Sequence, residues 1–127
     1  MAERLTEEER RTLLPSLGEA GWGADPNSDA LRKIWKFRSF SEAWAFMSRV
    51  ALLAEKRNHH PDWRNVFNVV DLRLTTHDCS GLSRLDTDMA LVIDRYAGAA
   101  EVQRDQAEEI SCLCQVRHSK APPPPKT

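Results

Sequence analysis

The spacing of hydrophobic residues along the first part of the chain predicts an amphipathic helix. Thr6 and Glu9 lie three residues apart and can form a capping box, in which each side chain accepts a hydrogen bond from the other residue's backbone. We expect this helix to begin after Thr6 and to end at Gly21. Pro15 and Gly18 predict that its later part is irregular.

Two further helices have the same start signal. Ser39 and Glu42 open the longest helix, which Asn58 can end, and Ser83 and Asp86 open the third. Apolar residues then recur at helical spacing, which predicts one buried face on each helix. These faces comprise Ala43, Phe46, Met47, Val50, Ala51 and Ala54 in the second helix, and Met89, Ala90, Ile93 and Ala97 in the third.

Alternating apolar and polar residues predict strands between the helices. Residues 30–40 alternate in this way and form one expected strand. Residues 63–76 are rich in β-branched and apolar residues, and form either one long strand or two short strands with a turn near Asn68. Periodicity does not decide between the two. Four apolar residues of this segment occupy even-numbered positions, which places them on one face of a strand: Val66, Val70, Leu72 and Leu74.

The order of these elements predicts the fold class. Helices and strands do not alternate strictly, so the pattern favours an α+β fold with an antiparallel sheet and helices packed on one face. We expect one domain over residues 1–97. Residues 99–116 could continue a helix, and the chain ends in a proline-rich stretch, so residues 98–127 are expected to form a flexible extension.

Composition then narrows the range of functions. A chain of 127 residues with 41% hydrophobic and 29% charged residues suits one globular domain. The formal net charge of −1, without a basic stripe, argues against a nucleic-acid surface. No secretory signal and no membrane-spanning run is recognisable. Three cysteines favour a reducing compartment, so we expect a cytoplasmic protein that is small enough to enter the nucleus by diffusion.

Three of the four histidines lie in the central region of the sequence. His59 and His60 follow the second helix, and His77 follows the second strand region. If the strand ends lie together, the three imidazoles converge, and imidazole titrates close to neutral pH. The spacing alone is equally typical of ordinary loop histidines at the ends of elements.

A metal site is the other chemical interpretation of these residues. His59, His60, His77 and Cys79 all carry atoms that bind zinc. Adjacent histidines often point apart, however, and no Cys-x-x-Cys or His-x-x-x-His spacing supports a site. Cys112 and Cys114 are weak evidence by themselves, so we expect no metal.

The residues around the histidines resemble the signature of a known family. The run from Glu55 to Asn68 reads EKRNHHPDWRNVFN, and it is followed by LTTHD over residues 74–78, by GLS over residues 81–83, and by Asp86. This arrangement closely resembles the pterin-4a-carbinolamine dehydratases, and the resemblance covers about residues 4–97. Phe67 stands where that family commonly has tyrosine.

The resemblance implies a four-stranded antiparallel sheet with three helices on one face, in a homodimer or homotetramer. It implies the dehydration of 4a-hydroxytetrahydrobiopterin to quinonoid dihydropterin, which supports the recycling of tetrahydrobiopterin for aromatic amino acid hydroxylases. The pterin is the substrate, and no metal or redox cofactor is expected, because the neighbouring ring nitrogen expels the leaving group.

The same resemblance implies a role for each site residue. His59 and His77 are the expected general acid and base, and His60, the third catalytic histidine, is expected mainly to hold the substrate. The expected pocket lining adds Asn58, Pro61, Thr75, Thr76 and Asp78, and the expected supporting residues are Glu55, Trp63 and Asp86.

A second, non-catalytic function is also implied. Animal members of the family act as dimerisation cofactors of homeodomain transcription factors of the hepatocyte nuclear factor type. In this chain such a role would use the exposed stripe of the second helix, which we expect to include Trp44, Met47 and Ala51.

Overall fold

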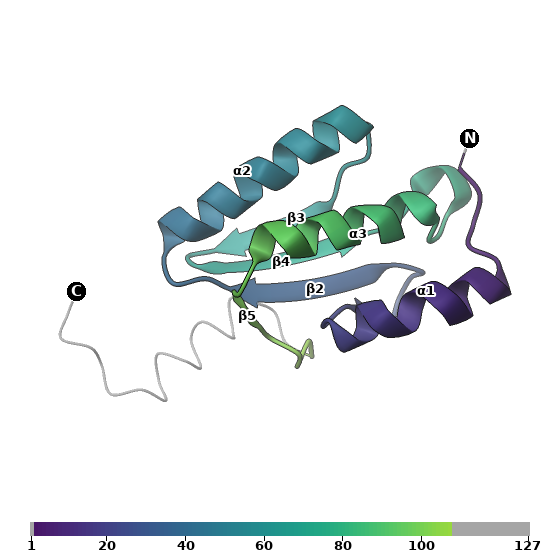
Figure 1. Ribbon diagram of the computed structural model, residues 1–127, viewed down its shortest axis with the longest axis horizontal. Coiled ribbons are helices and arrows are strands. Elements are labelled where there is room, and N and C mark those ends of the chain that lie inside the picture. Colours follow the sequence, from purple (N-terminus) through teal and green to yellow (C-terminus); the bar gives the residue numbers. More distant parts are fainter. Residues whose placement is uncertain (1, 108–127) are drawn as a thin grey trace.

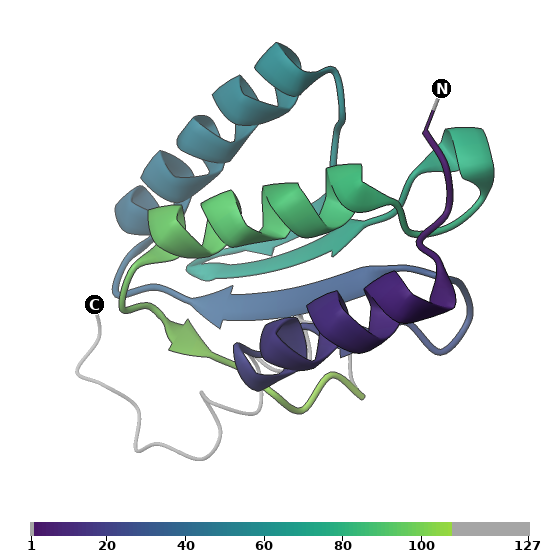
Figure 2. The ribbon, with the colours of Figure 1, turned by 45° about the vertical axis from the view of Figure 1, so that its right-hand side comes forward.

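A computed structural model describes residues 2–107 of the chain. Three helices lie on one face of an antiparallel sheet, as the sequence predicts (Figures 1 and 2). Among the described residues, no helix has the length and apolar character needed to cross a membrane. The elements are α1 (Glu7–Glu19), β1 (Gly23–Ala24), β2 (Leu31–Lys36), α2 (Phe40–Arg57), β3 (Asp62–Val66), β4 (Val69–Leu74), the 3₁₀ helix η1 (His77–Cys79), α3 (Arg84–Ala97) and β5 (Glu101–Val102).

The sheet has the strand order β1-β2-β4-β3, and β5 also pairs with β2. Strands β3 and β4 form a hairpin with a two-residue loop, since Val66 pairs with Val69. The region 63–76 is therefore two strands with a turn at Asn68. The hairpin also places Val66 beside Ile34 and Val69, apart from the main core. Val66 therefore does not share a face with Val70, Leu72 and Leu74, and that prediction is wrong.

Local capping explains where the helices begin and end. Thr6 and Glu9 form the predicted capping box of α1, and Ser83 and Asp86 form that of α3. Asn58 ends α2 in the left-handed conformation, with φ of 51°. At Ser39 only half of the predicted box is present, because the Glu42 carboxylate lies 3.2 Å from the guanidinium of Arg38 instead.

Two helix predictions need correction. Helix α1 is continuous through Pro15. This residue is exposed, and because it has no N–H, only one hydrogen bond of the helix is lost. Helix α2 exposes Ala51, which was predicted to be buried, and buries Leu53 instead. Its buried face runs through Phe46, Val50, Leu53 and Ala54. The expected strand 30–40 is also shorter, since β2 ends at Lys36 before the turn into α2.

Residues after α3 differ from the predicted helical continuation. Gly98 has a positive φ of 61° and ends α3, and the chain then pairs with β2 as β5. Further along, Gln106 exchanges hydrogen bonds with Arg32, whose guanidinium also pairs with Asp71 at 2.7 Å. This part of the extension therefore packs on the sheet, while residues 108–127, with the expected flexible proline-rich end, lie outside the described residues.

One charged residue lies inside the core. Lys33 faces the helices together with its strand neighbours Leu31 and Trp35, and its side chain is only 5% exposed. Its ammonium lies 2.7 Å from a carboxylate oxygen of Asp94 and within cation–π distance of Trp22 and Trp35. The ion pair and the aromatic rings offset the cost of removing this charge from water.

Candidate active site

The three central histidines meet at one end of the sheet. His59 and His60 lie between the last turn of α2 and the first residue of β3, and His77 opens η1 directly after β4 and Thr75–Thr76. Because β3 and β4 are antiparallel neighbours, the start of one lies beside the end of the other. The sequence predicts this convergence only on the condition that the strand ends are adjacent, and in the structure they are.

His59 is held by a buried carboxylate. Its Nε2 lies 2.6 Å from Oδ1 of Asp86, and the two side chains are 9% and 0% exposed. The other carboxylate oxygen of Asp86 accepts hydrogen bonds from Thr76 Oγ1 at 2.7 Å and from the Ser83 backbone at 3.0 Å. A carboxylate acceptor assigns the Nε2–H form to neutral His59, which leaves Nδ1 as the nitrogen free to exchange a proton with a substrate.

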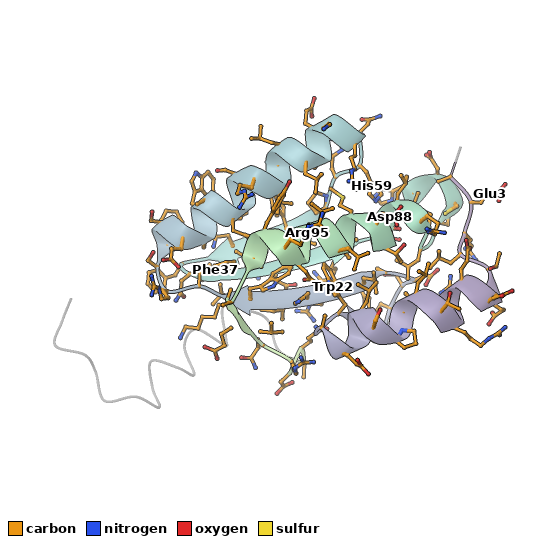
Figure 3. The ribbon with its side chains drawn as sticks, viewed as in Figure 1. Glu3, Trp22, Phe37, His59, Asp88 and Arg95 are labelled. Carbon is orange, nitrogen blue, oxygen red and sulfur yellow. The ribbon has the colours of Figure 1, made fainter. Side chains whose placement is uncertain are left out.

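The same contact links the end of α2 to the start of α3. Figure 3 shows His59 at the carboxyl end of α2, beside the amino-terminal part of α3. Asp86 is the third residue of α3 and at the same time the acidic partner in its capping box, so one carboxylate caps the helix and orients the imidazole.

His60 has a different environment. Its Nε2 lies 3.5 Å from Oε1 of Glu55, and the side chains are 58% and 85% exposed. Glu55 is therefore near a histidine, as the resemblance implies, but at a distance and an exposure where such a pair contributes little to stability. The imidazole of His60 is therefore accessible from solvent.

The loop that carries His77, residues 77–82, is fixed from several sides. Thr76 and Gly81 exchange backbone hydrogen bonds of 2.9 and 3.2 Å, which close the loop at its base. The guanidinium of Arg4 donates to the carbonyl oxygens of Cys79 and Ser80, at 2.8 and 3.0 Å. In both views the amino-terminal segment lies beside this loop (Figures 1 and 2).

Asp29 ties the same loop to α1. Its carboxylate accepts two hydrogen bonds from the Arg10 guanidinium, at 3.1 and 2.7 Å, and one from the backbone of Leu82 at 3.0 Å. The Arg10 contact, followed by the Leu82 contact, holds the pKa of the Asp29 carboxyl below its usual value. A side chain at Gly81 would force its neighbours to move, because a Cβ there would lie 2.5 Å from Asp29 Oδ2 and 3.2 Å from Arg4 Nε.

Sequence reasoning missed these anchors. Arg4 precedes α1, Arg10 lies in α1 and Asp29 lies between β1 and β2. They are up to 76 residues from their partners, so no local spacing identifies them. Leu85 was missed as well: it is half-exposed and lines a cleft together with the three histidines.

The histidines line a cleft of about 360 Å³, here named the histidine cleft. All eight residues that were predicted to line the substrate pocket lie around it, whereas Trp63 packs against the hydrophobic core. Within residues 2–107, no group of three or more His, Cys, Asp or Glu side chains is arranged to hold a metal ion. The full lining is Asn58, His59, His60, Pro61, Asp62, Thr75, Thr76, His77, Asp78 and Leu85.

This arrangement suits the transfer of protons to and from a small molecule. One imidazole is oriented by a carboxylate, and two more lie around the same cleft. Imidazole is a side chain that can both donate and accept a proton. Fold and site together define the class as an α+β protein with three histidines around one cleft.

Comparison with known proteins identifies the family within this class. The family model described as "Pterin 4 alpha carbinolamine dehydratase" matches residues 3–96. Proteins named "Putative pterin-4-alpha-carbinolamine dehydratase" from Burkholderia multivorans and Burkholderia lata are 47% and 50% identical to the chain, over 79% and 80% of its length and 96% and 97% of theirs. The chain belongs to the pterin-4a-carbinolamine dehydratase family.

Solved structures agree with this assignment. The crystal structure of a "transcriptional coactivator/pterin dehydratase" from Brucella melitensis has a TM-score of 0.70 and 42% identity, and it covers 75% of this chain and 99% of that one. A pterin dehydratase-like protein described as a RuBisCO assembly factor of the α-carboxysome shares the fold, with a TM-score of 0.55 and 24% identity, over 61% of this chain and 90% of that one.

Proposed function

We propose that the protein dehydrates 4a-hydroxytetrahydrobiopterin to quinonoid dihydropterin and water, and so supports the recycling of tetrahydrobiopterin used by aromatic amino acid hydroxylases. The observation that carries this proposal is the buried His59–Asp86 pair in a cleft that His60 and His77 also line. Family membership supplies the reaction, and the geometry of the cleft supplies the groups that the reaction needs.

The reaction requires two proton transfers. The C4a–O bond breaks while the electron pair on N5 forms the C4a=N5 double bond. The leaving hydroxide takes up one proton and becomes water, and N5 loses its own proton. One imidazole donates to the leaving oxygen and the other accepts from N5, so the pair returns to its starting protonation after proton exchange with water.

We assign these two transfers to His59 and His77. Asp86 keeps the Nε2 side of His59 occupied, so Nδ1 is the nitrogen that works on the substrate. Which of the two acts first depends on the face of the pterin that carries the hydroxyl. His60, exposed and only loosely paired, holds the substrate, together with Asn58, Pro61, Thr75, Thr76 and Asp78 along the cleft. No resident cofactor is part of this proposal.

The test uses carbinolamine generated by an aromatic amino acid hydroxylase, with dehydration followed by ultraviolet absorbance in the presence of a metal chelator. We expect acceleration by the native protein, and a loss of at least tenfold in kcat in His59→Ala and in His77→Ala with the fold intact, because each general acid–base contribution is worth on the order of 10²–10⁴-fold. Asp88→Ala, an exposed change on α3, is the matched control. Full activity in both histidine variants would contradict the assignment.

A second candidate function rests on the outer face of α2. Phe40, Trp44 and Leu52 are 49%, 55% and 73% exposed, and the first two rings stack at 6.0 Å. Met47, expected on this stripe, is buried instead. We propose this face for the contact between copies in a homodimer or homotetramer and, as the alternative to catalysis, for the dimerisation helix of a homeodomain transcription factor.

The oligomer is tested by light scattering of native protein and of Trp44→Glu. A smaller assembly in the variant supports the α2 contact, and an unchanged mass contradicts it. The reducing cytoplasm is the proposed location, with diffusion into the nucleus open to a protein of this size.

A further inference from the structure

The imidazole of His77 lacks the kind of partner that holds His59. A carboxylate oxygen of Asp86 lies 2.6 Å from the His59 ring, whereas within residues 2–107 no side chain forms a hydrogen bond or an ion pair with the ring of His77. His77 is also exposed. The place of its imidazole at the histidine cleft therefore depends on the backbone of the loop that carries it.

The backbone of this loop turns sharply at Ser80. This residue ends η1 with φ of 57°, in the left-handed region that a residue other than glycine enters only at an energetic cost. Its N–H donates to the carbonyl oxygen of His77 at 3.1 Å, so a shift of Ser80 is passed directly to the residue that carries the imidazole. A contact that fixes Ser80 thus helps to fix His77.

Arg4 makes that contact from outside the cleft, whose lining does not include it. Its guanidinium donates to the carbonyl oxygens of Cys79 and Ser80, at 2.8 and 3.0 Å. These carbonyls lie at the carboxyl end of η1, where an arginine side chain can satisfy acceptors that the helix leaves open. Because the N–H groups of a guanidinium form a rigid fork, two bonds to neighbouring carbonyls fix both the position and the direction of the backbone.

Arg4 is itself anchored at the base of the loop. It forms an isolated antiparallel bridge with Ser83, and the next residue, Leu5, donates its N–H to the carbonyl oxygen of Leu82 at 2.8 Å. Leu5 is also buried in the core. The backbone of Arg4 therefore lies beside residues 82–83, while its side chain reaches residues 79–80, so the guanidinium extends from a fixed base.

We infer that Arg4 is a positioning residue for His77, which holds the backbone of residues 79–80 so that the imidazole meets the reacting atoms of the substrate. This inference rests on the proposed function, and it gives Arg4 no contact with the substrate. Loss of the guanidinium should leave the fold intact, because its two hydrogen bonds are exposed and water can replace them. The rate should fall more than substrate binding, since a displacement of about 1 Å at a reacting group can cost on the order of 10²-fold.

The kinetic test compares Arg4→Ala with Arg11→Ala, a matched control that removes an exposed arginine of α1. We expect kcat to fall by about tenfold or more in Arg4→Ala, with KM changed by less than about twofold, and both constants to stay native in Arg11→Ala. Arg4→Lys should recover only part of the rate, because an ammonium lacks the forked geometry. Methylguanidinium should restore part of the rate of Arg4→Ala, and sodium chloride at the same ionic strength should not. A native kcat in Arg4→Ala would overturn the inference.

Double variants test whether Arg4 acts through His77. In a His77→Ala background, Arg4→Ala should cause no further loss of rate, because the residue that Arg4 positions is absent. In a His59→Ala background, Arg4→Ala should cause its full loss. Equal losses in the native protein and in both backgrounds would show that Arg4 supports the protein as a whole, and would overturn the inference.

A spectroscopic measurement separates this inference from the proposed function, because it does not depend on turnover. The imidazole proton resonances are assigned with the histidine variants. In Arg4→Ala the resonances of His77 should shift or broaden, and those of His59, which Asp86 holds, should stay unchanged. Unchanged His77 resonances would overturn the inference, and an active native protein would leave the proposed function standing. A native protein that does not dehydrate the carbinolamine would overturn the proposed function, and the His77 resonances would then decide the positioning role by themselves.

Discussion

Three pairs, each of one carboxylate and one nitrogen-bearing side chain, lie at or near the cleft, and they differ chiefly in their exposure to water. The side chains of His59 and Asp86 are 9% and 0% exposed, those of Arg10 and Asp29 are 27% and 30% exposed, and those of His60 and Glu55 are 58% and 85% exposed. The adjacent histidines thus sit in opposite environments. The comparison indicates that His59 is fixed by the fold, whereas His60 is left free to respond to a ligand.

The largest effect on stability is expected at the buried pair. Asp86→Ala leaves the His59 ring, the Thr76 hydroxyl and the Ser83 backbone without their acceptor, so the free energy of unfolding should fall by about 3–5 kcal/mol, the usual cost of breaking a buried pair. Urea unfolding followed by tryptophan fluorescence measures it. Asp88→Ala, two residues along α3 and exposed, should change stability by about 0.5 kcal/mol or less. A loss below about 1 kcal/mol in Asp86→Ala would remove the basis of the comparison.

An intermediate effect with a defined pH dependence is expected at Asp29. Its folded-state pKa lies below the unfolded value because of Arg10, so the folded protein binds fewer protons, and the stabilisation is present at neutral pH and is lost as the pH falls through the folded pKa. Asp29→Asn should therefore cost about 1–2 kcal/mol at pH 7 and progressively less toward pH 2–3.

Thermal unfolding between pH 2.5 and 7 tests this second expectation. The difference in unfolding free energy between native protein and Asp29→Asn should narrow as the solution is acidified. A difference that stays constant over this range would show that the carboxylate charge is not what ties α1 to the loop of His77.

A smaller effect on stability is expected at His60. Since its side chain is more than half exposed, His60→Ala should change the free energy of unfolding by about 0.5 kcal/mol or less. The expected change is in substrate binding, visible as a raised KM with kcat much less affected. An unchanged KM would contradict the substrate-holding role, and a loss of stability like that of Asp86→Ala would show that His60, like His59, is held by the fold.

The smallest effect is expected at Glu55. The carboxylate is 85% exposed and 3.5 Å from His60, so Glu55→Gln should alter stability by no more than about 0.5 kcal/mol. Its effect on KM should be smaller than that of His60→Ala and should diminish further in high salt. A large effect on kcat would instead show that Glu55 orients a reacting histidine when substrate is bound.

Local sequence signals predicted much of the fold. The capping boxes at Thr6 and Ser83 and the helix end at Asn58 are confirmed, because each depends on residues within one helical turn. Errors arose where a distant contact decides the outcome. The chain after Gly98 forms a strand because an edge of β2 is available to pair with it.

The site was predictable to a different extent. All of its lining residues except Leu85 fall within two short runs that carry the family resemblance, and the structure places them around one cleft. How the cleft is held rigid could not be deduced, because Arg4, Arg10 and Asp29 act across long separations in sequence. The alternating pattern of β2 places Lys33 on the same face as Leu31 and Trp35, but it does not identify Asp94 and the two aromatic rings that make a charge tolerable there.

The tight fit around Gly81 has a consequence for how homologous sequences can diverge. A methyl group at position 81 would collide with the carboxylate of Asp29 and crowd the guanidinium of Arg4. Replacing this glycine requires the Asp29 carboxylate to shift, and with it the hydrogen bonds from Arg10 and from the Leu82 backbone. The replacement is therefore tolerated most readily where position 29 or 4 has changed as well. Substitutions at these three positions should consequently be inherited together, although they lie in three separate parts of the chain.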